Sequence, residues 1–118
     1  MALHTDLPIY KLTYELMLLA MELIKNMRRD CKSTVGQKIN AECLDLSLLV
    51  YKANCAREKV PYLDRLIERV QVVELLFRLS VDLNLISLGQ YAKAIAITAK
   101  IGKQAGGWRK HSASSPAT

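Results

Sequence analysis

The chain has 118 residues, 51% of them hydrophobic and 24% charged, with only five glycines and three prolines. This length supports one domain with a single core, and the composition excludes a disordered or low-complexity chain. Lys, Glu or Arg interrupts every apolar run, which excludes a membrane-spanning segment, and the first residues lack a signal-peptide pattern, so we expect a cytoplasmic protein.

The net charge of +6 is concentrated in the last third of the chain. Up to Asp82 there are 12 basic and 11 acidic residues, whereas the residues after Asp82 include five basic and no acidic ones. Solvated faces usually mix both signs. The asymmetry therefore predicts an anionic partner, most commonly nucleic acid, although an anionic membrane surface or an acidic protein is an open alternative.

Residues 8–27 have the periodicity of a first helix, with Pro8 in its first turn. One apolar stripe consists of Ile9, Leu12, Leu16, Leu19, Leu23 and Met27. A second stripe beside it consists of Tyr10, Tyr14, Met17, Met21 and Ile24. Lys25, Arg28 and Arg29 fall in its predicted last turns, where cations suit the helix dipole.

The segment Lys32–Gly36 interrupts this periodicity, and Thr34 with Gln37 is expected to cap a second helix. That helix carries Ile39, Cys43, Leu46, Leu49 or Val50, and Ala53, and it fades near Ala56–Lys59. Pro61 opens a third helix, whose inward residues are Leu63, Leu66, Ile67, Val70, Val73, Phe77 and Val81, with Leu76, Leu79 and Leu83 close by. Asp82–Ser87 is the last predicted turn.

The last helix begins at Ser87, which forms a capping-box pattern with Gln90. Its predicted core face consists of Tyr91, Ile95, Thr98, Ile101 and Ala105. Gly106-Gly107 predicts the helix end, and the Trp108 ring is expected to fold back onto the end of the bundle.

Four helices joined by short connections predict an all-α, antiparallel up-down four-helix bundle. We place the bundle at residues 8–108, an N-terminal arm at 1–7, and a basic and then disordered tail at 109–118. No strand is expected, because period-two alternation is absent. The first and third helices have apolar sectors wider than a monomer needs. Either these two helices are deeply buried or, as we favour, they form a self-association surface.

Catalytic chemistry is not expected. The only histidines, His4 and His111, lie outside the predicted helical core, which removes a di-iron site and a Ser-His-Asp or Cys-His arrangement. Cys43 and Cys55 would lie about 120° apart on one helix, so they cannot share a metal ion. Asp64 and Glu68 alternate with basic residues, as in a solvated salt-bridge ladder. We therefore expect no enzyme, no metal and no cofactor.

Binding is the function that these residues favour. The candidate nucleic-acid-binding residues are Lys93, Lys100, Lys103, Arg109 and Lys110. Lys93, Lys100 and Lys103 are spaced along the last helix in a way that suits contacts with a phosphate backbone, and Arg109 and Lys110 continue the charge beyond its predicted end. Few aromatic residues accompany them, so base stacking is not expected. The alternative is an ordinary solvated lysine face.

Two stretches resemble a bacterial family of small four-helix-bundle proteins. They are Phe77–Tyr91, with Arg78-Leu79, Ile86-Ser87 and Gln90-Tyr91, and Ile101–Trp108, with Ile101-Gly102 and Gly106-Gly107-Trp108. The family includes the accessory variability determinant of diversity-generating retroelements and proteins encoded in intervening sequences of large-subunit ribosomal RNA genes.

This resemblance implies a homopentameric barrel of bundles with a basic surface. For the retroelement branch it implies a non-enzymatic accessory protein that binds RNA or DNA and the element's reverse transcriptase and supports mutagenic retrohoming. For the ribosomal intervening-sequence branch the alternative is an oligomeric scaffold that binds a protein partner. Arg78 matches a family position, but an ion pair would equally explain it.

Overall fold

The computed structural model of the chain describes residues 3–114, and this part is all-α, with no strand. The long helices are α1 (Pro8–Lys25), α3 (Gln37–Cys55), α4 (Val60–Asp82) and α5 (Leu88–Ser114). The short elements are η1 (His4–Asp6), α2 (Arg29–Cys31) and the π-turn η2 (Lys32–Gly36). The expected helical class is confirmed.

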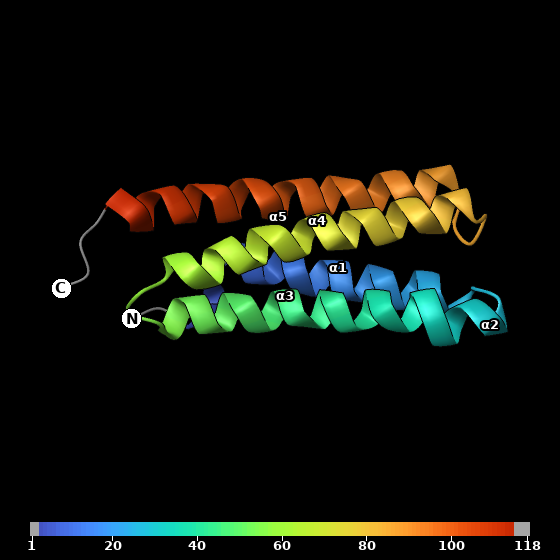
Figure 1. Cartoon of the computed structure of the whole chain (residues 1–118), viewed down its shortest axis with the longest axis horizontal. Coiled ribbons are helices and arrows are strands. Elements are labelled where there is room, and N and C mark those ends of the chain that lie inside the picture. The colour runs from blue at the N-terminus through green and yellow to red at the C-terminus, as the bar shows by residue number, and fades with distance from the viewer. Residues whose placement is uncertain (1–2, 115–118) are drawn as a thin grey trace.

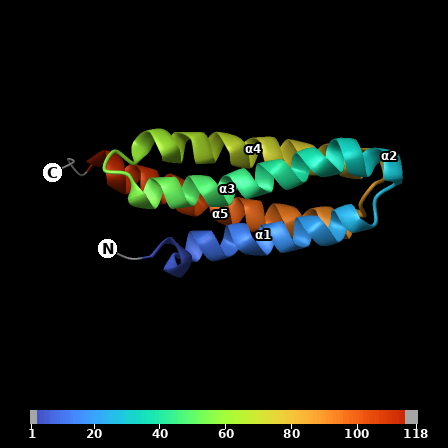
Figure 2. The same ribbon diagram turned by 90° about the horizontal axis from the view of Figure 1, so that it is seen from below.

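The four long helices pack as an elongated bundle of 50 × 20 × 19 Å (Figure 1). Both α1 and α4 pack against α3 and α5, so the four helices form a closed ring around one core. Figure 2 shows that consecutive long helices run in opposite directions. The short connections dictate this order, because they can join only the neighbouring ends of antiparallel helices.

The core contains the first predicted stripe of α1 and the inward face of α4. Ile9, Leu16 and Leu23 are buried on α1, and Phe77 is the largest fully buried side chain. Each helix therefore gains most of its stability from one apolar stripe facing the core. The second predicted stripe of α1 is less buried than the first, since Tyr14 is 50% exposed.

Proline side chains mark the starts of α1 and α4, and a lysine side chain closes the end of α3. Pro8 and Pro61 both lie in the first turn of their helices, as predicted. The Lys59 Nζ donates hydrogen bonds to the carbonyl oxygens of Ala53, Asn54 and Ala56 at 2.9–3.0 Å. These bonds satisfy carbonyls that the end of α3 leaves without a helical partner.

The α4–α5 turn reverses the chain at Asn84, whose φ is 60°. Asparagine tolerates this left-handed conformation better than most residues. The Leu85 N–H donates to the Ser80 carbonyl oxygen at 2.8 Å, which closes the end of α4. The predicted turn over Asp82–Ser87 agrees with this geometry.

The predicted break at Lys32–Gly36 is wrong, because α2, η2 and α3 form one continuous helical rod. Thr34 does not cap α3: its Oγ1 donates back to the carbonyl oxygens of Asp30 and Cys31, at 3.1 and 3.4 Å. In addition, α1 ends at Lys25. Arg28 and Arg29 therefore precede and begin this second rod, and they do not lie in the last turn of α1.

Gly36 allows α1 to approach the π-turn closely. It is buried, and a Cβ added there would lie 2.9 Å from the Cγ2 of Ile24. This contact is shorter than packed carbon atoms accept. The π-turn and the end of α1 can therefore meet only because residue 36 has no side chain.

Several large apolar side chains remain exposed on the outside of the bundle. They are Tyr14, Leu18 and Met21 on α1, Leu44, Leu48 and Tyr51 on α3, Leu75 and Leu79 on α4, and Leu83 directly after α4. Each set follows helical spacing, and α1 and α3 are neighbours. Exposed apolar residues were expected on the first and third long helices, whereas those on α3 were not expected.

One buried carboxylate is compensated by an arginine on the neighbouring helix. Glu42 of α3 is 5% exposed, and Arg69 of α4 donates to both of its oxygens at 2.8 and 3.0 Å. This hydrogen bonding is the main cause of the raised Arg69 pKa. The pair links α3 to α4, because either charge left alone would be costly to bury.

Candidate nucleic-acid interface

The start of α5 has the predicted capping box. The Ser87 N–H donates to the Gln90 Oε1 at 2.8 Å, and the Gln90 N–H donates to the Ser87 Oγ at 3.1 Å. The two residues thus satisfy each other's free backbone donors at the helix start. The lysines that follow are therefore placed on a helix with a defined first turn.

The predicted end of α5 is wrong, since the helix continues through Gly106 and Gly107 to Ser114. A glycine ends a helix by adopting a left-handed conformation, and no glycine of residues 3–114 has a positive φ. Buried Ala105 and half-buried Trp108 continue to pack on the core around these glycines. The predicted tail is therefore helical up to Ser114, and residues 115–118 lie outside the described part.

The Trp108 side chain packs on the end of the bundle, as expected. It lines a hollow of about 240 Å³ together with Leu7, Pro8, Ile9 and Gln104. The ring is half-buried and contacts the core cluster, so it holds the last turns of α5 against the start of α1. An indole packed in this way contributes to the core and is not free for base stacking.

The buried face of α5 is rotated slightly from the predicted one. Ala94 and Ile97 are buried, whereas the predicted Tyr91 and Ile95 are half-buried. Thr98 is fully buried, and its Oγ1 donates to the Glu74 Oε2 of α4 at 2.8 Å. This packing turns the lysines of α5 away from the core.

Lys93 and Lys100 line one groove between α5 and α1. The groove has a volume of about 400 Å³, and Glu15 and Leu19 of α1 form its opposite wall. The two lysines are seven residues apart, which brings them to nearly the same side of a helix. The Glu15 carboxylate is the only acidic group that lines the groove, so the local charge is positive.

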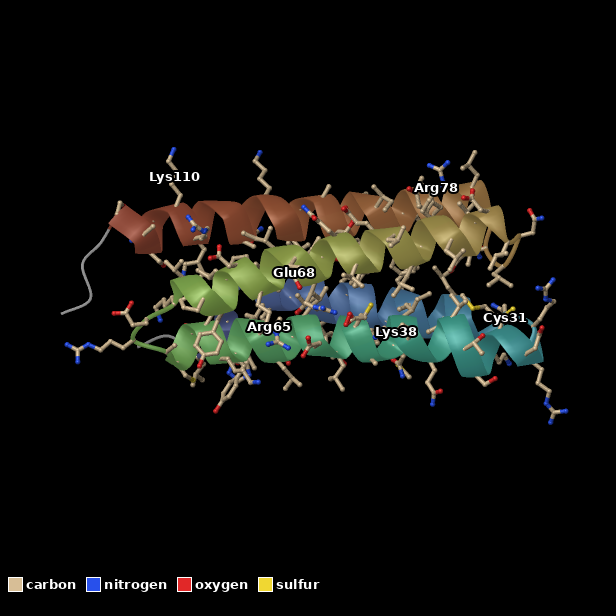
Figure 3. All side chains as sticks on the ribbon, in the orientation of Figure 1. Cys31, Lys38, Arg65, Glu68, Arg78 and Lys110 are labelled. Atoms are coloured by element: carbon tan, nitrogen blue, oxygen red, sulfur yellow. The ribbon has the colours of Figure 1, made fainter. Side chains whose placement is uncertain are left out.

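Lys103 and Lys110 are exposed beside this groove. They are separated by seven residues, as Lys93 and Lys100 are, so they form a second line along α5. In Figure 3, Lys110 points outward from the bundle. Between these lysines the other exposed residues of α5 are uncharged and comprise Ala96, Ala99, Gln104 and Gly107.

Arg109 differs from the four lysines because it has an acidic partner. Its Nε donates to the Asp64 Oδ1 of α4, and this hydrogen bond raises the pKa of the Arg109 guanidinium above its ordinary value. The ion pair attaches the end of α5 to the start of α4. The structure thus brings four of the five predicted residues to the surface without an ion pair within residues 3–114 and ties the fifth to α4.

Arg78 lies in an exposed ion pair at the other end of α4. Its Nε lies 3.3 Å from both carboxylate oxygens of Asp82, and the nearby Asp82 charge is the largest cause of its raised pKa, to which Tyr91 also contributes. This is the i,i+4 pairing that an isolated helix favours. Figure 3 shows Arg78 near the α4–α5 turn, distant from Lys110.

A second basic region lies at the π-turn end of the bundle, and the charge asymmetry of the sequence does not reveal it. Between positions 25 and 38 there are five basic residues and one acidic residue, Asp30. The basic residues are Lys25, Arg28, Arg29, Lys32 and Lys38. A count over short windows would have found this region, whereas a count over the whole first part averages it away.

Other chemistry was sought in the same part of the chain. Within residues 3–114 there is no group of three or more His, Cys, Asp or Glu side chains placed to hold a metal ion. No helix in that range has the length and apolar character needed to span a membrane. Burial, helped by the Glu42 charge, raises the pKa of the Cys43 thiol to about 12, so this cysteine is a neutral core residue.

Comparisons with known proteins find no family model, no curated protein and no solved structure that matches the chain. The family resemblance of the last third therefore stays a prediction.

Proposed function

We propose that this protein is a non-enzymatic nucleic-acid-binding protein that contacts the phosphate backbone of RNA or DNA through α5. The observation that carries the proposal is the surface of α5 itself. Lys93, Lys100, Lys103 and Lys110 are exposed along a helix that bears no acidic residue, and the other exposed residues between them are uncharged. A bulky, highly charged backbone can approach such a surface closely.

The same surface favours backbone contacts over base recognition. Lysine acts as a point charge on a flexible stem, which suits phosphates and reads no sequence. The aromatic residues of α5, Tyr91 and Trp108, are both half-buried against the bundle. Binding is thus expected to depend strongly on salt and weakly on sequence.

The test replaces Lys93, Lys100 and Lys103 with glutamine together. Glutamine keeps a long, helix-compatible side chain, so circular dichroism should remain unchanged. On duplex DNA each lost phosphate contact flattens the slope of log K against log salt by about 0.9, and on single strands by about 0.7. The triple variant should therefore lose about two to three slope units per bound protomer.

A matched control replaces three other exposed basic residues, Lys11, Lys52 and Arg65, with glutamine and so changes the net charge equally. The slope of log K against log salt should be closer to the wild-type slope for the control than for the α5 variant. Equal slopes for the α5 variant and the wild-type protein, with intact helicity, would show that α5 is an ordinary solvated face.

The cellular role that we propose follows from the resemblance at Phe77–Tyr91 and Ile101–Trp108. It is that of an accessory protein of a diversity-generating retroelement, which binds the reverse transcriptase as well as RNA or DNA and supports mutagenic retrohoming. A reverse-transcriptase gene beside the gene for this chain would support the role. Its absence, with a ribosomal RNA gene in its place, would indicate the intervening-sequence branch.

Self-association, as a homopentamer, is part of the same proposal. Its support is the exposed apolar side chains on α1, α3 and α4, since patches of this kind mark interfaces. Light scattering should give a multiple of the 13.3 kDa chain mass, and Leu48→Gln together with Leu18→Gln should lower it. A wild-type mass of 13.3 kDa would contradict self-association.

The second candidate function is a scaffold that binds a protein partner and no nucleic acid. The neighbouring exposed residues of α1 and α3, which include Tyr14 and Tyr51, favour it, because aromatic residues are common in protein interfaces. Capture of partners after complete nuclease digestion separates the two functions. A retained protein supports the scaffold, and loss of all partners supports bridging by nucleic acid.

A further inference from the structure

The π-turn forms the floor of an open hollow at one end of the bundle. The hollow has a volume of about 320 Å³ and lies between the end of α1 and the rod formed by α2, η2 and α3. Ile24 and Gly36 provide its apolar part. Its polar lining consists of Arg29, Lys32, Ser33, Gln37 and Asn40, so no carboxylate lines it.

The two cations of the hollow have no ion-pair partner within residues 3–114. The acidic residue nearest to them in sequence is Asp30. Its Oδ1 forms an ion pair with the Nε of Arg28 at 3.8 Å, and not with Arg29 or Lys32. Surface cations in a folded protein are usually interspersed with acids. Arg29 and Lys32 instead lie three residues apart, which places them as neighbours on one side of the rod.

The neutral side chains add donors to this charge. The amides of Gln37 and Asn40 make no hydrogen bond to any other described residue, so both NH₂ groups are available to a ligand. Ser33 is different, because its hydroxyl already donates to the Asp30 carbonyl oxygen at 3.2 Å. The lining thus offers one guanidinium, one ammonium and two amides to an acceptor-rich ligand.

The backbone at this point is unusual for a reason that packing explains. A π-turn is rare and frequently occurs at functional sites. Here it is held by the approach of Ile24 to Gly36, which leaves no room for a side chain at position 36. The hollow is therefore a built feature of the junction between α1 and the second rod.

We propose that this hollow binds a backbone phosphate of RNA or DNA. The inference rests on the proposed nucleic-acid binding and adds a second contact point, distant from the lysines near the end of α5. Phosphate is the favoured ligand because it is anionic and rich in acceptors, and because guanidinium groups pair with it in a bidentate manner. The open shape suits a group on a polymer, which must enter and leave from one side.

The position of the hollow determines how a long ligand would lie. Cys31, beside the hollow in sequence, and Lys110 mark opposite ends of the bundle in Figure 3. The bundle is 50 Å long, and phosphates of one duplex strand are spaced by about 3.4 Å along the axis, so about 15 base pairs match its length.

The main test compares Arg29→Gln/Lys32→Gln with the control Lys11→Gln/Lys52→Gln, which removes the same charge elsewhere. All four side chains are exposed, so the fold should survive, and circular dichroism checks this. On duplex DNA the hollow variant should flatten the slope of log K against log salt by about 0.9, the value for the one phosphate that the hollow binds. The control should leave the slope within about half of one contact of the wild type.

A second pair of variants keeps size constant and adds a negative charge. Asn40→Asp introduces a carboxylate into the hollow, and the control Gln71→Glu introduces one on the exposed surface of α4. Asn40→Asp should weaken binding at low salt at least about fivefold, because like charges about 4 Å apart repel even in water. Gln71→Glu should weaken it less than twofold.

Inorganic pyrophosphate tests the hollow without nucleic acid. Its addition should shift the amide resonances of residues 29–40 selectively, and Arg29→Gln/Lys32→Gln should abolish these shifts. Shifts spread evenly over all lysine-bearing helices, or unchanged in the variant, would overturn the phosphate site.

The outcomes separate this inference from the function on which it rests. If the α5 triple variant loses slope and the hollow variant matches its control, the nucleic-acid function stands and the phosphate site is refuted. If the hollow variant loses slope and the α5 variant does not, the hollow is the binding site and the assignment to α5 is wrong. If the wild-type protein binds neither RNA nor DNA, both proposals fail.

Discussion

Replacing Gly36 with alanine tests the close packing at the π-turn. The new methyl group would lie 2.9 Å from the Cγ2 of Ile24 and 3.4 Å from the Cys31 carbonyl oxygen. Ile24 cannot easily yield, because the methyl group belongs to a β-branched side chain with a stiff χ1 angle. The clash must therefore be relieved by moving α1 away from the second rod.

Two opposing contributions to the free energy of unfolding decide how far Gly36→Ala changes stability. Overpacking a close contact typically costs about 1–3 kcal/mol. Replacing glycine by alanine within a helix returns about 1 kcal/mol through helix propensity. The expected net result is a loss of about 1 kcal/mol in the free energy of unfolding, or about 4 °C in Tm for a chain of this length.

Gly107→Ala is the matched control, because it makes the same chemical change in a helix with open surroundings. A Cβ at Gly107 would meet nothing within 4 Å. This variant should therefore gain up to about 1 kcal/mol, with Tm rising by up to about 4 °C. The two variants should change stability in opposite directions.

Urea unfolding followed by circular dichroism measures both variants, with the slope m checked for constancy. Ile24→Ala combined with Gly36→Ala completes the cycle, since it removes the methyl group that clashes, and the coupling between the two sites should be favourable. A Gly36→Ala variant as stable as Gly107→Ala would refute the account of the π-turn as a junction that excludes a side chain.

Two further predictions concern buried groups of α3 and α4. The raised pKa of Cys43 means that the folded chain keeps its proton while the unfolded chain loses it, so this contribution to stability is complete below about pH 9 and is lost as pH rises toward 12. Alkaline unfolding curves should show a smaller decline for Cys43→Ala, and in the folded protein a thiol reagent should modify exposed Cys55 and spare Cys43. Arg69→Met leaves the Glu42 charge buried and should cost about 3 kcal/mol, more than Glu42→Gln, in urea unfolding; equal costs would contradict the compensating role of Arg69.

Much of the fold could be predicted because local patterns and packing agree along most of the chain. The stripe containing Leu16 and the capping box of Ser87 and Gln90 are short-range signals, and both are present as predicted. The proline positions at the starts of α1 and α4 are signals of the same kind. Periodicity also predicted that α1 has more apolar residues than its core contacts use.

The errors occurred where tertiary packing overrides a local signal. Gly106-Gly107 favours a helix end, yet Trp108 packs on the core and the Arg109–Asp64 pair holds the following turn on α4. The Lys32–Gly36 segment resembles a loop, and only the approach of Ile24 shows why it is helical. Neither contact can be inferred from neighbours in sequence.

The charged residues of the candidate site could be predicted from the sequence, whereas their arrangement in space could not. Charge counting found the lysines of α5, but it could not show that Lys93 and Lys100 share a groove with Glu15 or that Arg109 is paired with Asp64. The hollow at the π-turn was not predicted, because its lining residues had been assigned to the end of the first helix, to the break at Lys32–Gly36 and to the start of the second helix. Their grouping depends on the continuous rod from α2 to α3.

The π-turn also sets the rotational phase between the two parts of this rod. A π-turn closes its hydrogen bonds over five residues instead of four, so it accommodates one residue more than an α-helix would. If the same five residues, Lys32–Gly36, were wound as a regular α-helix, the preceding residues would be rotated by about 100° relative to α3. Arg29 would then leave the side on which Asn40 lies, and buried Cys31 would turn away from the core. The π-turn thus takes up one additional residue and keeps Arg29 and Cys31 on their sides of the rod. A natural deletion of that one residue would leave both sides, and all four long helices, in place.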